Sequence, residues 1–176
     1  EGLRDELLEH AHLLSVGAGW AAALRNQGCV EAPASPTATF WSELDGHGFC
    51  LGLLRQRPGL AALTPELRDT PVEVALDQGL GRSLYFAHGG APEAIARMIA
   101  ATPSRRRGAL WSGVGLASVF TDGLDDETRS RLRASGGRDL EFGEQLASWV
   151  LSGTGRTDGR FDGAEPPLLT LRRLAT

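Results

Sequence analysis

Small and large apolar residues recur along this chain at the spacing of a helical face. After Gly17, a small residue follows four positions later and a large apolar residue seven positions later, and the same order follows Gly46, Gly79, Gly113 and Gly143. Positions i, i+4 and i+7 lie on one side of an α-helix. The pattern therefore predicts five helices with a common arrangement of small and large side chains.

A Gly-x-Gly pair marks the centre of the first four of these helices. The pairs are Gly17/Gly19, Gly46/Gly48, Gly79/Gly81 and Gly113/Gly115, and a fifth, weaker copy surrounds Gly143. Successive first glycines lie 29, 33, 34 and 30 residues apart, which is the period of a two-helix unit. We expect a mainly α protein, a compact array of helix pairs built on a repeat of about 30 to 34 residues with Gly-x-Gly helices.

The repeated glycines require a packing reason. A helix with glycine at an interior position is less stable, by roughly 1 kcal/mol, than the same helix with alanine there. A small-x-x-x-small stripe lets neighbouring helices approach more closely than leucine or phenylalanine would allow. We therefore predict close backbone contact between neighbouring glycine helices.

The segments between the glycine helices predict the second helix of each unit. Residues 91–99 place a proline near the first turn, then a glutamate and periodic apolar residues, which is typical of a helix start. Residues 64–67 and 125–128 begin in the same way, with an N-cap candidate followed by acids. Loops are predicted at residues 103–108 and 135–138 from their Gly, Pro and Ser content.

One domain accounts for most of the chain. Its 176 residues, 41% hydrophobic, suffice for a single globular core. We expect residues 1–151 to form a single helical-repeat domain. Residues 152–176 turn to Gly, Asp, Arg and Pro and are predicted to be a mobile C-terminal tail.

Charge and composition narrow the possible partners. The 18 cationic residues, all arginine, face 22 acids for a net charge of -4, and without a basic face a nucleic acid partner is not expected. No uncharged apolar run reaches the roughly 18 residues of a membrane span. The charged N-terminal residues do not resemble a signal peptide, so we expect a cytoplasmic protein without a transmembrane segment.

Cofactor and metal motifs are absent from the sequence. Cys29 and Cys50 lie alone, without metal-ligand spacing. Gly17 and Gly19 match a dinucleotide-binding turn only in part, because the acid that should follow about 20 residues later is not at that position. We therefore predict no bound cofactor and no metal.

Four polar residues interrupt the repeat where other copies are apolar or small. They are Asp45, His47, Asp77 and Arg82. A carboxylate near an imidazole can orient a general base, and an arginine can bind an anionic group, so these are the candidate catalytic residues. In the alternative interpretation, Asp45 and Asp77 cap helix starts and Arg82 belongs to an internal ion pair.

Two further features have structural and functional interpretations. Arg105, Arg106 and Arg107 could receive a phosphate or an acidic partner, although a solvated loop is the simpler interpretation. The aromatic residues near the glycine helices are expected in the core, but an array with aromatic walls could also line an apolar ligand site. They are Trp20, Trp41, Tyr85, Phe86, Trp111, Phe120 and Trp149.

Four motifs in this order resemble the UnbL family, whose uncharacterised members are encoded beside the iterative polyketide synthases of enediyne biosynthesis. The motifs are Val16–Ala21, Leu44–Phe49, Asp77–Phe86 and Leu110–Ala117. The resemblance implies participation in converting a linear polyene into the enediyne core. It supplies no agreed catalytic residues.

Two functions remain open at this point. An accessory protein that binds a polyene-like apolar small molecule, or helps to process it, should have an apolar cavity reached by Asp45, His47, Asp77 and Arg82. A non-catalytic interaction module that holds other biosynthetic proteins should instead have a filled core and an exposed patch.

Overall fold

The fold is known from a computed structural model that describes residues 11–25, 38–54, 70–121 and 123–151. All regular secondary structure in these ranges is helical, as the sequence predicts. The helices are α2 (Ala11–Leu24), α3 (Ala38–Leu54), α4 (Pro71–Ala87), α5 (Pro92–Ala100), α6 (Ser104–Phe120) and α7 (Asp126–Leu151). None of the helices described is both long and apolar enough to cross a bilayer.

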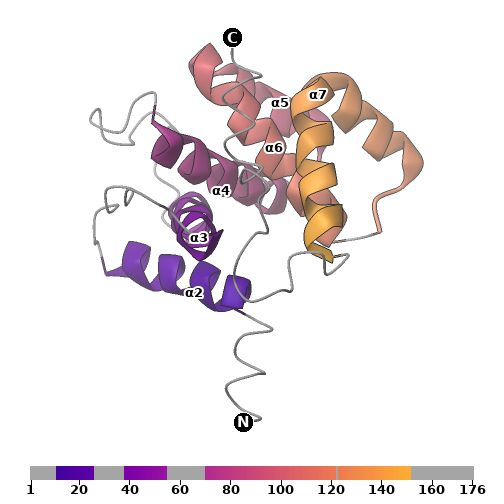
Figure 1. Ribbon diagram of the computed structural model, residues 1–176. Coiled ribbons are helices and arrows are strands. Elements are labelled where there is room, and N and C mark those ends of the chain that lie inside the picture. Colours follow the sequence, from indigo (N-terminus) through magenta and orange to yellow (C-terminus); the bar gives the residue numbers. More distant parts are fainter. Residues whose placement is uncertain (1–10, 26–37, 55–69, 122, 152–176) are drawn as a thin grey trace.

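Five of the helices pack against one another in chain order. Helix α3 lies between α2 and α4, α4 packs on α6, and α6 packs on α7 (Figure 1). The short α5 lies against α4, α6 and α7. Helices α4 and α6 are buried over most of their length, because neighbours cover them on more than one side.

Glycines occupy the crossing points between successive helices in the series α2, α3, α4, α6 and α7. At the crossing of α3 and α4, a Cβ on Gly79 would overlap the carbonyl oxygen of Asp45 and lie 2.7 Å from the backbone nitrogen of Phe49. In return, a Cβ on Gly48 would overlap the carbonyl oxygen of Leu76. The close backbone approach predicted for these glycines is therefore present.

The other crossings repeat this reciprocal contact. Gly19 and Gly46 join α2 to α3, Gly81 and Gly113 join α4 to α6, and Gly115 and Gly143 join α6 to α7. At each of these glycines a Cβ would overlap a carbonyl oxygen of the neighbouring helix. Only glycine allows the backbones this close.

The starts of α4 and α7 follow local sequence signals. The hydroxyl of Thr70 accepts a hydrogen bond of 3.2 Å from the Glu73 N–H and caps α4. The carboxylate of Asp125 accepts one of 2.7 Å from the Thr128 N–H and caps α7. The helices predicted from residues 91–99 and 125–128 are confirmed, whereas residues 64–67 and the tail at 152–176 lie outside the described residues.

Of the two predicted loops, the one at residues 103–108 is wrong. Residues 103–108 open α6 instead, because Ser104 already begins the helix and Arg106 reaches α4 from its first turns. The break predicted at residues 135–138 is confirmed at Gly137, whose φ of 53° and ψ of -139° are not helical, although the two stretches it joins follow each other directly as α7. The break lets Leu132 and Leu140, each 1% exposed, pack on the same core cluster.

Replacing Gly79 by alanine should lower the free energy of unfolding by about 2 to 4 kcal/mol, because the new Cβ overlaps the backbone of α3. The matched control is Gly108→Ala, whose Cβ would have the flexible Asp139 carboxylate as its nearest neighbour, at 3.2 to 3.4 Å, instead of a backbone. It should be neutral or stabilising by up to about 1 kcal/mol. Urea unfolding measures the free energy of unfolding of both variants. If the two variants lost equal stability, the role given to the glycine crossing would be contradicted.

Candidate functional site

Polar side chains of α4 face its neighbours on two sides. Because α4 is buried along most of its length, each of its polar groups needs a partner inside the protein. The Gln78 side-chain amide donates to the Ser112 hydroxyl of α6 at 3.3 Å. Asp77 and Arg82 form ion pairs, one on each side of the helix.

Arg82 of α4 forms an ion pair with Asp45 of α3. Both side chains are mostly buried, with 16% and 10% of their surface exposed. Burial raises the pKa of Asp45, while the charge and the hydrogen bond of Arg82 oppose that shift. The Arg82 guanidinium also lies 4.8 Å from the centre of the Phe49 ring, a cation–π contact.

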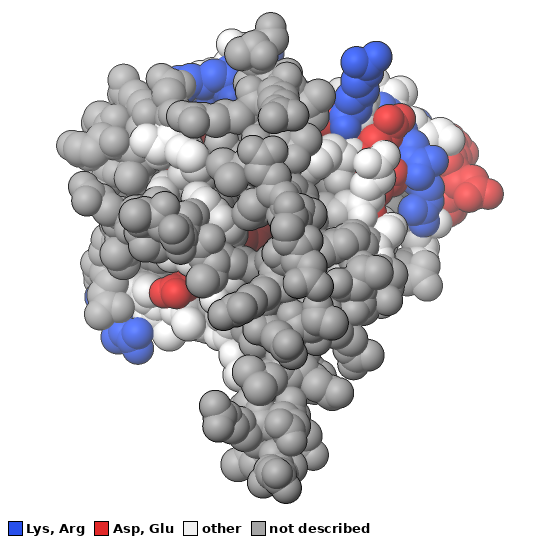
Figure 2. Space-filling model, in the orientation of Figure 1, with Lys and Arg blue, Asp and Glu red and all other residues white. Residues whose placement is uncertain are grey.

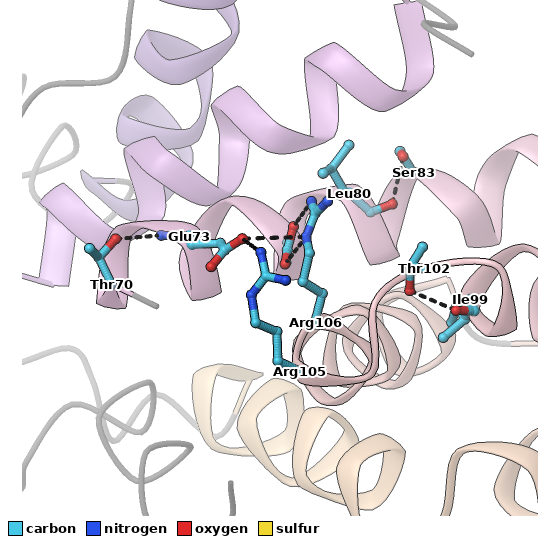
Figure 3. A network of polar contacts seen from close by, with 9 residues as sticks. Thr70, Glu73, Leu80, Ser83, Ile99, Thr102, Arg105 and Arg106 are labelled. Atoms are coloured by element: carbon cyan, nitrogen blue, oxygen red, sulfur yellow. Dashed lines mark hydrogen bonds and ion pairs between the residues drawn. The ribbon is translucent and has the colours of Figure 1, made fainter. Parts of the chain in front are cut away.

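Asp77 pairs with Arg106 on the opposite side of α4. The Arg106 Nε donates to Asp77 Oδ2 at 2.8 Å, and Nη2 contacts the other carboxylate oxygen. Glu73 joins the pair, with its Oε1 3.1 Å from Arg105 Nη2 and 3.6 Å from Arg106 Nε (Figure 3). Burial raises the pKa of Asp77 to about 6, against the opposing effect of Arg106.

These contacts decide between several interpretations of the sequence. Asp45 and Asp77 lie inside helices, so the helix-cap interpretation is wrong, whereas Arg82 does sit in an internal ion pair. The solvated-loop interpretation of residues 105–107 is wrong for Arg106, which is 4% exposed. Arg106 precedes Gly113 by two helical turns, so both lie on the face toward α4, and that spacing could have identified it.

His47 is buried in α3 two residues after Asp45. Side chains two residues apart in a helix point to different sides, so the helix does not favour an Asp45–His47 acid–base pair. The structure brings Asp45 together with Arg82 and joins Asp77 to Arg106. The catalytic roles expected for Asp45, His47, Asp77 and Arg82 stay predictions.

Aromatic rings from three successive helices form a row beside the Asp45–Arg82 pair. The Phe49 ring of α3 lies 5.1 Å from the Trp20 ring of α2 and 5.5 Å from the Phe86 ring of α4, measured between centroids. Phe49 is buried, whereas Phe86 is 44% exposed. The row therefore extends from the interior to the surface next to a charged pair.

Three buried polar atoms, two of them in this pair, lack a hydrogen-bond partner among the described residues. They are Trp41 Nε1, Asp45 Oδ1 and Arg82 Nε. A buried donor or acceptor without a partner costs about 1 to 3 kcal/mol. Within the pair, the Arg82 Nε donor and the Asp45 Oδ1 acceptor could bind the polar group of a ligand.

The surface of α7 has a different character. An open hollow there is lined by Arg133, Glu141, Glu144, Gln145 and Ser148, and Arg133 pairs with Glu144 at 2.9 Å. Side chains of both charges gather on the side of the molecule where α7 lies (Figure 2). Within the described ranges, no group of three His, Cys, Asp or Glu side chains could hold a metal ion.

The sequence profile of the DUF1702 family, described as proteins of unknown function, matches residues 2–157. The chain therefore belongs to this family. No curated protein and no solved structure matches it.

Replacing Arg106 by methionine should lower the free energy of unfolding at pH 8 by about 3 to 5 kcal/mol, because Asp77 would stay buried without a counter-charge. Arg105→Met is the matched control, since Arg105 is 39% exposed and its pair with Glu73 should contribute less than about 1 kcal/mol. Chemical denaturation compares the two, and a small loss for Arg106→Met would contradict the role given to the buried pair.

The raised pKa of Asp77 predicts a pH effect of defined sign. Between the ordinary value of 3.8 and about 6, the folded protein binds more protons at Asp77 than the unfolded chain does. Its contribution to the free energy of unfolding therefore falls as pH rises through this window. The stability of the wild type relative to Asp77→Asn should fall by on the order of 1 to 3 kcal/mol from pH 4 to pH 6.5. If the relative stability instead grew with pH, the effect of Arg106, which lowers the pKa of Asp77, would exceed the effect of burial, which raises it.

Proposed function

We propose that the protein is an accessory protein of enediyne polyketide biosynthesis that binds a linear polyene. The pathway rests on the resemblance of its four glycine motifs to the UnbL family. The site rests on one observation: Arg82 Nε and Asp45 Oδ1 are buried without a hydrogen-bond partner among the described residues, beside the row Trp20, Phe49 and Phe86.

A conjugated polyene matches the shape and chemistry of the aromatic row. The Trp20 and Phe49 rings are tilted by 37° and the Phe49 and Phe86 rings meet edge to face at 79°, so a flat apolar chain would contact ring faces and ring edges in turn. Each aromatic contact contributes about 0.5 to 1.5 kcal/mol beyond burial. The row spans three helices, and its exposed end at Phe86 lets a ligand approach from solvent. Apolar sites with a few polar groups are typical of small-molecule binding.

The polar residues then have distinct roles. Arg82 donates from Nε to a polar end of the ligand. Asp45, whose pKa burial raises, is suited to exchange a proton with that end. Asp77, held by Arg106, stabilises α4 against α6 and does not contact the ligand.

Binding can be tested with a conjugated tetraene fatty acid, whose fluorescence rises when it leaves water. The wild type should give a saturable rise, and Arg82→Met and Phe86→Ala should each weaken binding at least about tenfold. Phe86 is 44% exposed, so its variant should fold normally even if Arg82→Met does not. Arg133→Met, which breaks an ion pair on α7, is the control and should bind as the wild type does.

The second candidate function is a non-catalytic interaction module. The glycine crossings favour it, because they commit the glycine faces between neighbouring helices to packing. If the folded wild type gives no saturable fluorescence rise, polyene binding is wrong. Co-elution of the protein with the polyketide synthase in gel filtration would then support the module.

A further inference from the structure

Each helix crossing has the symmetry of a local two-fold axis. Gly19 lies on the carbonyl of Glu43, three residues before Gly46, and Gly46 lies on the carbonyl of Val16, three residues before Gly19. The other three crossings show the same relation in both directions. A helix that presents an uncovered glycine of this kind is therefore complementary to a second copy of itself.

Gly17 of α2 is such a glycine. In α3, α4, α6 and α7 the first glycine of the repeat contacts the backbone of the preceding glycine helix. At Gly17, a Cβ would meet no atom of the described chain within 4 Å, and the residue is exposed. Helix α2 thus has one face covered by α3 through Gly19 and, at Gly17, one face that no described residue covers.

The surroundings of Gly17 are apolar and exposed. Leu13, Leu14 and Leu24 are 58%, 52% and 52% exposed, and Ala18 is also exposed. From Ala11 to Leu24 the helix contains no Asp, Glu, Lys or Arg. Exposed leucines around a glycine crossing point indicate a protein contact.

We propose that α2 pairs with α2 of a second copy of this chain about a two-fold axis, with each Gly17 on the Leu14 carbonyl of the other copy. Leu14 precedes Gly17 by three residues, as the relation at the other crossings requires. On a two-fold axis every side chain near the centre meets its own copy, so a face without charges suits self-association. Such an isologous contact closes at two subunits.

Helix α7, at the other end of the described array, cannot pack on Gly17 of another copy in the same way. In α3, α4 and α6, the residue two positions after the first glycine is also glycine and contacts the next helix. In α7 this position holds Gln145, which is exposed and carries a side chain where the crossing needs none. A head-to-tail chain of copies is therefore not favoured over the closed dimer.

Sedimentation velocity of the full chain under reducing conditions tests the proposal, with reductant present because of Cys29 and Cys50. The wild type should be a dimer at about 100 µM. Gly17→Leu and Leu14→Glu should each raise the dissociation constant at least about tenfold, by filling the crossing point and by placing two like charges at the axis. Ala134→Leu, at an exposed position of α7, should leave the dimer intact.

Circular dichroism should show the same helix content for all variants, because both positions are exposed. A wild type that stays monomeric at about 100 µM overturns the proposal, and the face would then belong to a glycine-bearing helix of another protein. A dimer that survives both α2 substitutions overturns it as well. Polyene binding plays no part in this measurement, so either inference can fail alone.

Discussion

The contact between a glycine of one helix and a backbone carbonyl of the next is the interaction on which this structure depends. It occurs in both directions at every crossing between neighbouring glycine helices described. Because no Cβ separates the backbones, Cα–H groups lie directly on carbonyl oxygens, and such contacts contribute about 0.5 to 1 kcal/mol each. The glycines thus recover in packing what they lose in helix propensity.

Close helices also determine which polar groups can meet. Helix α4 is covered by both α3 and α6, so its charged side chains must find partners across those two interfaces. Asp45 and Arg82 form a pair on one side, and Asp77 and Arg106 form a pair on the other. Buried pairs of this kind contribute little net stability, but breaking one leaves an uncompensated charge, which favours one register of the helices.

The two ends of the array differ because the repeat changes along the chain. Helix α2, the first helix described, contains no Asp, Glu, Lys or Arg and has an apolar face around Gly17, whereas α7 carries the Arg133–Glu144 ion pair and has Gln145 in place of a second glycine. Trp20, the first ring of the aromatic row, follows Gly17 by three residues on α2. The proposed ligand site and the proposed pairing face therefore share one helix, and occupancy of one can influence the other.

The sequence by itself determined the helical class, the positions of the glycine helices, α5 and the start of α7, because these follow from local spacing, caps and turns. It also identified Asp45 and Arg82 as exceptional. Tertiary structure alone decided that residues 103–108 open a helix, that Arg106 pairs with Asp77 29 residues away, and that Trp20, Phe49 and Phe86 form one row. These outcomes depend on how neighbouring helices cross, and a one-dimensional pattern shows which face of a helix is apolar without showing which helix will cover it.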